Sequence, residues 1–490
     1  MKKMNKRGFL IFMLGLLLVA AAWVVTDTLF RQLWFDEALT LLEFTSRDTW
    51  WSIYLSYAIP NNHIVFNLLL RFFIDLQSFF LPIADFSFRL FPALMALATP
   101  LLLFSVWRKV LGPFSAFLVS FCFCLSLPFQ INATAIRGYL LSFLLVLAAF
   151  ELARRWQENN RPLFLYLYFG VAFLAVGTIP SNLLPLLAVG AYFLPECGFN
   201  PFSKKFLLLF VLPLPAFLLF YGPILQSFLH VLSLKEGWSN GLAAAYCTYG
   251  AFACAVLPLL FFALAGAIWK WRKSSATARL RGSWRFLCLL VPLPVFLILP
   301  AAPFPRVFFP FWPLWLFLLG LLVREFFSSL ELRRERTACG IFFMGIILCS
   351  IGGLGARDWR AELAGTFVKK GGLDDFFDPY YMRSDFKPFT VAIALAEFSK
   401  DLKVSPEVFV SFDADPYPLV FYGKFQGVPE TVWKYDSPRG KVASLGEAAA
   451  PVLLVLRDGE LDSVRHRFKL EGKRISLLED AGFQKLYLAE

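Results

Sequence analysis

The chain has 490 residues, of which 58% are hydrophobic and 58 are Phe, and its mean hydropathy is +0.63. This composition excludes an ordinary soluble domain and predicts a protein that crosses a membrane many times. The net charge of +12 is uneven: residues 1–356 carry 28 Lys and Arg against 14 Asp and Glu, whereas residues 357–490 carry 19 against 21. The positive excess therefore belongs to the apolar part, where it indicates membrane orientation and no nucleic-acid partner.

The apolar part divides into segments about as long as a bilayer-spanning helix, which needs about 20 mostly apolar residues. The first, residues 8–26, follows four basic residues without an evident small-residue cleavage site, so we expect a retained signal anchor. Ten further spans are predicted at residues 88–107, 111–130, 138–153, 163–180, 182–196, 206–228, 247–269, 286–302, 307–323 and 338–356. Placing the six clusters of Lys and Arg in the cytoplasm gives eleven crossings of a membrane, with a cytoplasmic N-terminus and a C-terminus on the outer side, periplasmic or extracellular.

Residues 27–87, between the first two spans, predict one long outer loop. This loop contains the pair Asp36 and Glu37, an amphipathic stretch from about residue 38 to 57, and a turn before His63. Residues 64–82 are apolar enough to span a membrane but are interrupted by Asn67, Arg71, Asp75 and Gln77. We therefore expect a helix that lies in the outer interface and does not cross.

Residues 357–490 predict a small soluble α/β domain. An amphipathic helix is expected at 388–402, and short strands are expected at 408–412, 419–422, 452–456 and 485–488. The predicted fold is thus an all-α polytopic bundle in residues 1–356, of about eleven transmembrane helices with outer juxtamembrane helices, followed by this domain.

Asp36 and Glu37 are the first candidates for chemistry. A carboxylate at the membrane centre costs about 2.5–3.5 kcal/mol, so an acidic pair beside a span needs a reason. A general base or an electrostatic anchor is one reason, because partial burial can raise a carboxylate pKa toward neutrality. A solvated loop or a helix cap is the alternative.

His63 follows Pro60-Asn61-Asn62 and could hydrogen-bond a phosphate or sugar, or bind a metal with Asp36. A polar residue that merely opens a helix is the alternative. Only seven basic residues face outward in this topology, and their guanidinium groups could converge on a phosphate or could snorkel to lipid headgroups. They are Arg31, Arg47, Arg71, Arg89, Arg137, Lys235 and Arg306.

No metal site is predicted. The eight Cys all precede residue 350 without a Cys-x-x-Cys or Cys/His spacing, which indicates buried structural thiols. The acidic residues Asp374, Asp375 and Asp378, and the pair Asp413 and Asp415, match no calcium loop. A divalent cation stays open as a cofactor.

Five motifs in chain order resemble a known family. They are Trp34-Phe35-Asp36-Glu37-Ala38, Asn61-Asn62-His63-Ile64, Arg89-Leu90-Phe91-Pro92 with Arg108-Lys109 and Gly112, Arg137-Gly138-Tyr139, and the stretch with Arg306, Phe308 and Pro310. Together they resemble the polyprenyl-phosphate-dependent glycosyltransferases of glycosyltransferase family 39, which have the GT-C fold and include lipid A aminoarabinose transferases and protein O-mannosyltransferases. The resemblance covers residues 8–330. Ile64 and Val65 stand where that family has two prolines after the His.

The resemblance implies an enzyme that transfers a hexose or pentose from a polyprenyl-phosphate donor to a lipid, glycan or protein of the cell envelope. It implies that Asp36 deprotonates or orients the acceptor and that Glu37 positions donor or acceptor. The residues it implies for substrate binding are His63, Arg89, Arg137, Tyr139 and Arg306. Two alternatives remain. A metal-dependent oligosaccharyltransferase would need further outer-loop carboxylates, and a lipid or solute transporter often shows internal repeats and ionisable residues at the bilayer midplane.

Overall fold

A computed structural model describes residues 6–55, 57, 62–80, 85–233, 241–287, 290–298, 305–329, 340, 385–401, 406–436, 441–445 and 451–490. The chain forms two compact units. The helical unit contains residues 1–29 and 48–378, and the sheet unit contains residues 30–47 and 379–490. A short segment from the N-terminal part of the chain therefore folds with the C-terminal residues. The expected domain boundary at residues 356 and 357 lies outside the described residues and stays a prediction.

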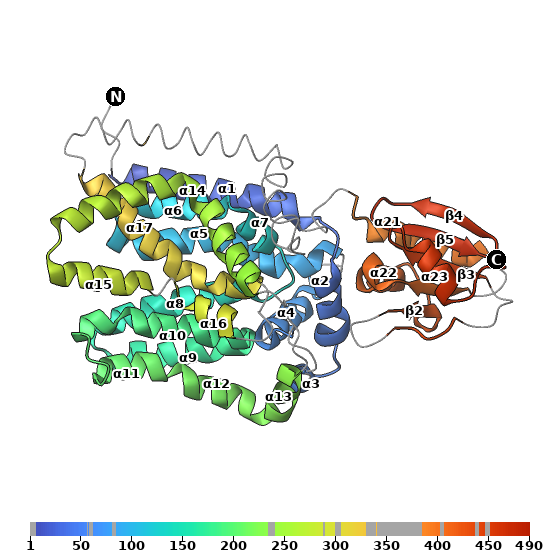
Figure 1. The fold of residues 1–490 in the computed structure, drawn as a ribbon, viewed down its shortest axis with the longest axis horizontal. Helices are drawn as coiled ribbons and strands as arrows, with labels where there is room; N and C mark the ends of the chain where they lie inside the picture. The colour runs from blue at the N-terminus through green and yellow to red at the C-terminus, as the bar shows by residue number, and fades with distance from the viewer. Residues whose placement is uncertain are drawn as a thin grey trace. The chain divides into compact units, whose positions relative to one another are not determined.

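The described part of the helical unit is built from helices (Figure 1). They are α1 (Lys6–Leu29), α3 (Trp50–Leu55), α4 (Ile64–Gln77), α5 (Leu90–Leu111), α6 (Pro113–Cys124), α7 (Leu127–Ala133), α8 (Tyr139–Asn159), α9 (Pro162–Thr178), α10 (Leu183–Tyr192), α11 (Lys204–Val211), α12 (Pro213–Tyr221), α13 (Leu225–Ser233), α14 (Gly241–Lys273), α15 (Ala276–Leu287), α16 (Pro292–Ile298) and α17 (Trp312–Ser329).

Glycine, asparagine and proline set the tight connections between these helices. Gly112 has a φ of +79° and ends α5, and Pro113 then begins α6. In the same way Asn160, with a φ of 57°, ends α8 two residues before Pro162 begins α9. A left-handed residue closes a helix, and a proline is suited to the first turn of the next. These short turns lay α5 against α6 and α8 against α9.

Four helical segments of the described chain are long and apolar enough to cross a membrane, namely Arg7–Leu29, Phe86–Leu111, Lys204–His230 and Arg306–Ser328. Helices α6 and α7 meet at 66°, and they add a fifth if they form one broken span. These segments coincide with the predicted spans at 8–26, 88–107, 206–228, 307–323 and 111–130. The predicted span at 338–356 falls almost wholly outside the described residues, and the number of eleven crossings stays a prediction.

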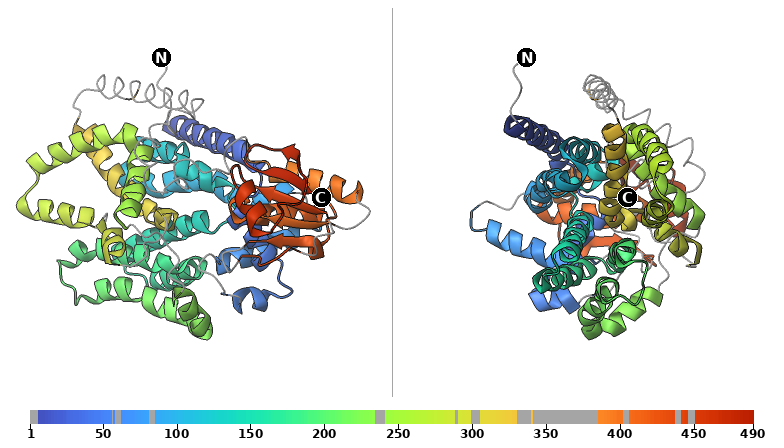
Figure 2. Two further views of the ribbon diagram at one scale, coloured as in Figure 1. Left: turned by 45° about the vertical axis from the view of Figure 1, so that its right-hand side comes forward. Right: turned by 90° about the vertical axis from the view of Figure 1, so that its left-hand side faces the viewer.

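Helices α14 and α17 pack against each other (Figures 1 and 2). A Cβ atom added at Gly266 of α14 would lie 2.1 Å from the carbonyl oxygen of Leu322 in α17. Only glycine allows the two backbones to come this close, as in helix pairs that associate within membranes.

The sheet unit contains a five-stranded mixed sheet in the order β2-β1-β3-β5-β4. Strand β1 pairs in parallel with β2 and β3, and β5 pairs antiparallel with β3 and β4. The strands are β1 (Glu407–Val410), β2 (Trp433–Tyr435), β3 (Val452–Leu456), β4 (Ile475–Asp480) and β5 (Lys485–Ala489), and the main helices are α21 (Pro388–Asp401), α22 (Pro416–Phe425) and α23 (Leu461–Arg467).

Alternating side chains of the central strands divide between two cores. Val408 and Val410 of β1 pack with residues of α21 and α22, whereas Phe409 packs on the opposite face with Val464 of α23. Strand β3 supplies both cores, and all five of its residues are buried. A strand covered on both faces is expected to be apolar throughout, which explains its sequence Val-Leu-Leu-Val-Leu.

The predicted helix at 388–402 and the predicted strands at 408–412, 452–456 and 485–488 correspond to α21, β1, β3 and β5. The predicted strand at 419–422 is wrong, because these residues lie within α22. Pro416 begins this helix, and a run of four apolar residues is too short to distinguish a helix from a strand. Strands β2 and β4 were not predicted.

Candidate functional site

The acidic motif lies at the start of a short helix in the sheet unit. Helix α2 (Phe35–Leu39) runs directly into one π-helical turn, η1 (Thr40–Thr45). Asp36 is 5% exposed and Glu37 is fully buried, so neither is a solvated loop residue. Two interpretations remain for this pair, a helix cap and a catalytic role. The contacts of each carboxylate distinguish between them.

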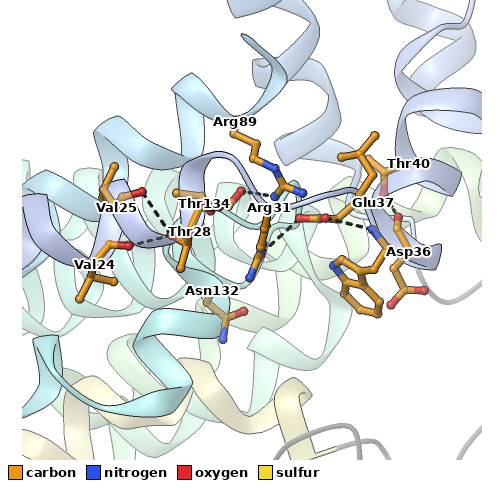
Figure 3. A network of polar contacts seen from close by, with 12 residues as sticks. Val24, Val25, Thr28, Arg31, Asp36, Glu37, Thr40, Arg89, Asn132 and Thr134 are labelled. Atoms are coloured by element: carbon orange, nitrogen blue, oxygen red, sulfur yellow. Dashed lines mark hydrogen bonds and ion pairs between the residues drawn. The ribbon is translucent and has the colours of Figure 1, made fainter. Parts of the chain in front are cut away.

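Glu37 is held by groups within its own segment. Its Oε1 accepts from Nη2 of Arg31 at 3.4 Å, and its Oε2 accepts the backbone N–H of Trp34 at 3.4 Å (Figure 3). The second contact is half of a capping box, because the Trp34 side chain at the N-cap has no acceptor to complete it. Glu37 thus anchors the entry to α2.

Asp36 has a different environment from Glu37. Its backbone carbonyl accepts the hydroxyl of Thr40 at 2.7 Å, a bond that holds the helix at the transition from α2 to η1. Figure 3 shows the two carboxylates pointing in different directions, with that of Glu37 toward Arg31. Neighbouring positions on a helix do not face each other, so the pair can serve two separate roles.

A second cluster forms in the helical unit around His63, the N-cap of α4. Its Nδ1 accepts the backbone N–H of Gly138, the N-cap of α8, at 2.7 Å. The ring packs edge-on against Tyr139 with centroids 4.9 Å apart, and its Nε2 lies 3.5 Å from Nη2 of Arg137. His63, Arg137 and Tyr139 are all buried. The structure thus brings three of the predicted substrate-binding residues together.

The bond from Gly138 fixes the protonation of the imidazole. A backbone N–H can only donate, so Nδ1 of His63 must be the unprotonated nitrogen and Nε2 must carry the hydrogen. Burial lowers the pKa of His63 well below 6.5, and the charges of Arg137 and Arg306 lower it further. Neutral His63 therefore presents Nε2–H beside the guanidinium of Arg137, and the two N–H donors lie 3.5 Å apart between Nε2 and Nη2.

Gly138 is required for this close approach. An added Cβ would lie 2.7 Å from Cγ2 of Thr178 and 3.0 Å from Nδ1 of His63. The φ of Gly138 is −75°, so space and not backbone strain demands glycine here. In the sequence, Gly138 was identified only as part of the Arg-Gly-Tyr motif, and its contact with His63 was not predicted.

Arg89 joins helix ends in the helical unit. Its Nη1 donates to the carbonyl of Thr134 at 2.9 Å, and the hydroxyl of Thr134 donates to the carbonyl of Thr28 at 2.9 Å (Figure 3). The side chain is 1% exposed. Through Thr134 the Arg89 guanidinium therefore links the end of α7 to the end of α1, and Thr134 lies three residues before Arg137 in the sequence.

Arg71 has a local partner. Its Nε lies 2.8 Å from Oδ1 of Asp75, one turn further along α4, and both side chains are partly exposed. Arg306, at the start of the segment Arg306–Ser328, lies near enough to His63 for its charge to act there. Asp36 and Glu37 belong to the other compact unit. Among the described residues, no group of three or more His, Cys, Asp or Glu could hold a metal ion.

No protein-family model matches this sequence, and no curated protein matches it either. The structure is similar to that of ArnT from Cupriavidus metallidurans in the apo state, with a TM-score of 0.58, 12% identity and 98% of each chain covered. It is similar to ArnT bound to undecaprenyl phosphate with a TM-score of 0.60, 12% identity, and 99% of this chain and 98% of that chain covered. The structure of the Archaeoglobus fulgidus oligosaccharyltransferase in complex with Zn and sulfate has a TM-score of 0.41 and 13% identity, and the match covers 83% of this chain and 61% of that chain. A likeness this weak supports no conclusion about this protein.

The likeness to ArnT extends over nearly the whole of both chains, so it includes the sheet unit as well as the helices. At 12% identity it shows the fold and not the activity. The predicted fold class is confirmed: this is a multi-pass membrane protein with a mostly helical, ArnT-like fold and a C-terminal domain that contains a mixed five-stranded sheet.

Proposed function

We propose that the protein is a membrane glycosyltransferase that moves a sugar from a polyprenyl-phosphate carrier to an acceptor of the cell envelope. The observation that supports the proposal is that two buried donors, Nε2–H of His63 and the Arg137 guanidinium, lie side by side in an ArnT-like fold. One of the two ArnT structures is bound to undecaprenyl phosphate, which is a polyprenyl phosphate. Such a carrier needs N–H donors for its phosphate and an apolar surface for its tail.

The donor cluster suits the phosphate that leaves during transfer. Negative charge grows on the phosphate as its bond to the sugar breaks, and fixed donors directed at that charge lower the barrier. Arg137 and Arg306 supply positive charge, and His63 supplies a hydrogen bond in its neutral state. Tyr139 packs against the His63 ring and holds its plane.

Asp36 is the proposed general base. The acceptor hydroxyl forms a bond to the anomeric carbon from the face opposite the carrier, its proton passes to Asp36, and the electron pair of the broken bond goes to the phosphate. This step inverts the anomeric centre. Glu37, held by Arg31 and the Trp34 amide, would set the orientation of the helix that carries the base. A positioned base typically contributes about 10²–10⁴-fold to the rate.

The reaction is proposed for the outer face of a bacterial inner membrane. The distribution of Lys and Arg supports this orientation, because cytoplasmic loops carry the positive excess. Reporter fusions after residues 60, 109 and 370 would test it: activity of a periplasmic reporter is expected after residues 60 and 370 only.

The test of activity uses the full-length protein in lipid nanodiscs, a set of radiolabelled polyprenyl-phosphate sugars, and cell-envelope extract. Label is expected to move to an acceptor with the wild type, and about 10²–10⁴-fold more slowly with Asp36→Asn. Asp48→Asn, the same change at an exposed residue, is the matched control and should transfer at the wild-type rate. Equal rates for wild type and Asp36→Asn would contradict the proposed role of Asp36.

A further inference from the structure

The segment that carries Asp36 is held by side chains and backbone that lie more than 350 residues away in the sequence. The backbone N–H of Leu33 donates to the hydroxyl of Tyr422 at 2.8 Å, and that of Phe35 donates to Oδ2 of Asp415 at 3.2 Å. A third bond runs the other way, from the N–H of Phe389 to Oε1 of Gln32 at 2.8 Å. All of these residues belong to the sheet unit.

These bonds satisfy groups that a helix start leaves open. Phe35 is the first residue of α2, and the first N–H groups of a helix have no partner within it. The N-cap residue Trp34 has no side-chain acceptor, so it cannot cap the helix as Ser or Asp would. Asp415 supplies both the missing acceptor and a negative charge at the positive end of the helix.

Asp415 is placed by the framework of the sheet. It follows the central strand β1 and one 3₁₀ turn, η9 (Phe412–Ala414), and it directly precedes α22. Its φ is 59°, a left-handed conformation that Asp and Asn tolerate better than most residues, and it is 3% exposed. The carboxyl end of a central parallel strand is where open α/β sheets commonly bind ligands. Here it binds a segment of the same chain.

Aromatic contacts reinforce the hydrogen bonds. The ring of Phe35 packs edge-on against Tyr417 with centroids 4.8 Å apart and against Phe412 at 5.7 Å. Leu42, in η1, packs against the core that α21 and α22 form with the sheet. A five-residue helix is too short to be stable alone, so these contacts determine its position.

We infer that Asp415 and Tyr422 are positioning residues for Asp36, and that the sheet unit is part of the catalytic apparatus because it caps and orients the helix bearing the base. The role in catalysis rests on the proposed function. The ordering of residues 30–47 by these two side chains does not depend on any activity.

Three variants of the full-length protein separate capping from backbone conformation. Asp415→Gly tolerates the positive φ but loses the oxygen that accepts the N–H of Phe35. Asp415→Asn tolerates the positive φ and keeps an acceptor oxygen. Tyr422→Phe removes only the hydroxyl that accepts the Leu33 amide. Tyr487→Phe, the same change on β5 of the same sheet, is the matched control.

The first readout is hydrogen exchange of the amides in residues 30–47. Exchange should become faster in Asp415→Gly and Tyr422→Phe, change much less in Asp415→Asn, which loses only the charge, and stay at the wild-type rate in Tyr487→Phe. Residues 452–456 serve as an internal check that the sheet remains folded. Unchanged exchange of residues 30–47 in both Asp415→Gly and Tyr422→Phe would overturn the inference.

The second readout is transfer kinetics. Losing one hydrogen bond should lower kcat roughly fivefold in Tyr422→Phe, with KM for the polyprenyl donor unchanged, because the proposed donor site lies in the helical unit. Combining Asp415→Gly with Asp36→Asn should slow transfer no more than Asp36→Asn alone, since both act through one carboxylate. A multiplicative loss would contradict positioning. If the wild type moves no label, the proposed function fails, while the exchange result still decides whether Asp415 and Tyr422 order the segment.

Discussion

The two polar clusters of this protein are built in opposite ways. In the helical unit, His63 receives its hydrogen bond from the backbone of another helix start, and the buried guanidinium of Arg137 lies beside its ring. In the sheet unit, Glu37 is held by Arg31 and by an amide of its own segment, and the helix is capped by Asp415. The first arrangement places N–H donors side by side, as proposed for the lipid phosphate, whereas the second holds the Glu37 carboxylate and the start of the helix that carries Asp36. A glycosyl transfer from a lipid phosphate needs one site of each kind.

The strongest test of this contrast is Arg137→Gln. In the proposed complex, Arg137 and the lipid phosphate form a buried, hydrogen-bonded charge pair. Removing one partner of such a pair costs about 2–5 kcal/mol, so the Kd for undecaprenyl phosphate should rise about 30-fold or more. The measurement is binding of that lipid to the full-length protein in nanodiscs. Arg161→Gln, at an exposed position between α8 and α9, should leave the Kd unchanged.

Asp36→Asn should leave the same Kd unchanged, because Asp36 is proposed to act on the acceptor and not on the phosphate. If Arg137→Gln binds undecaprenyl phosphate as tightly as the wild type, the donor cluster has no role in phosphate binding. The distinction between the two clusters would then be structural only.

Gly138→Ala should disrupt the donor cluster from within. Its Cβ would lie 2.7 Å from Thr178 and 3.0 Å from the His63 ring, and overpacking of this kind typically costs about 1–3 kcal/mol. Thermal unfolding should show the loss of stability, together with weaker binding of undecaprenyl phosphate. Gly170→Ala is the matched control on α9, because no atom lies within 4 Å of its added Cβ. Alanine is favoured in a helix, so this control should be as stable as the wild type or more stable.

The sequence predicted the elements whose signal is local. The amphipathic pattern at 388–402 and the apolar run at 452–456 predicted α21 and β3, because the order of apolar residues within each segment shows how it is buried. The site was only partly predictable because it depends on contacts between distant segments. His63 was noticed as a rare residue after a turn, but its partner Gly138 is 75 residues away, and Asp415 is 380 residues from Phe35. A single sequence contains no periodicity that reports such pairs, and it gave no sign that residues 30–47 fold with the C-terminal sheet.

The stability of the wild type should depend on pH through His63. Its pKa in the folded protein lies well below 6.5, whereas the unfolded chain titrates near 6.5. Below about pH 6.5 the unfolded state therefore binds more protons than the folded state. The contribution of His63 to the free energy of unfolding is fully present above that pH and is lost as the pH falls toward the lowered pKa. The loss is at most about 1.4 kcal/mol per pH unit.

His63→Asn removes the titrating group and keeps an acceptor near the position of Nδ1. Its melting temperature should therefore change less than that of the wild type between about pH 7.5 and about pH 5.5. An equal change in both proteins would assign the pH dependence to other groups.

Arg71→Gln should have the smallest effect, although the sequence placed Arg71 on the same outer side as Arg137. Its partner is Asp75 at 2.8 Å, four residues along α4, and such pairs on a helix surface contribute about 0.3–0.5 kcal/mol. Thermal unfolding should shift slightly, and binding of undecaprenyl phosphate should be unchanged. Asp75→Asn should shift unfolding by the same amount, because either change breaks the one pair. A large loss of lipid binding in Arg71→Gln alone would extend the proposed phosphate site along α4 and would remove the distinction between Arg71 and the cluster of His63, Arg137 and Arg306.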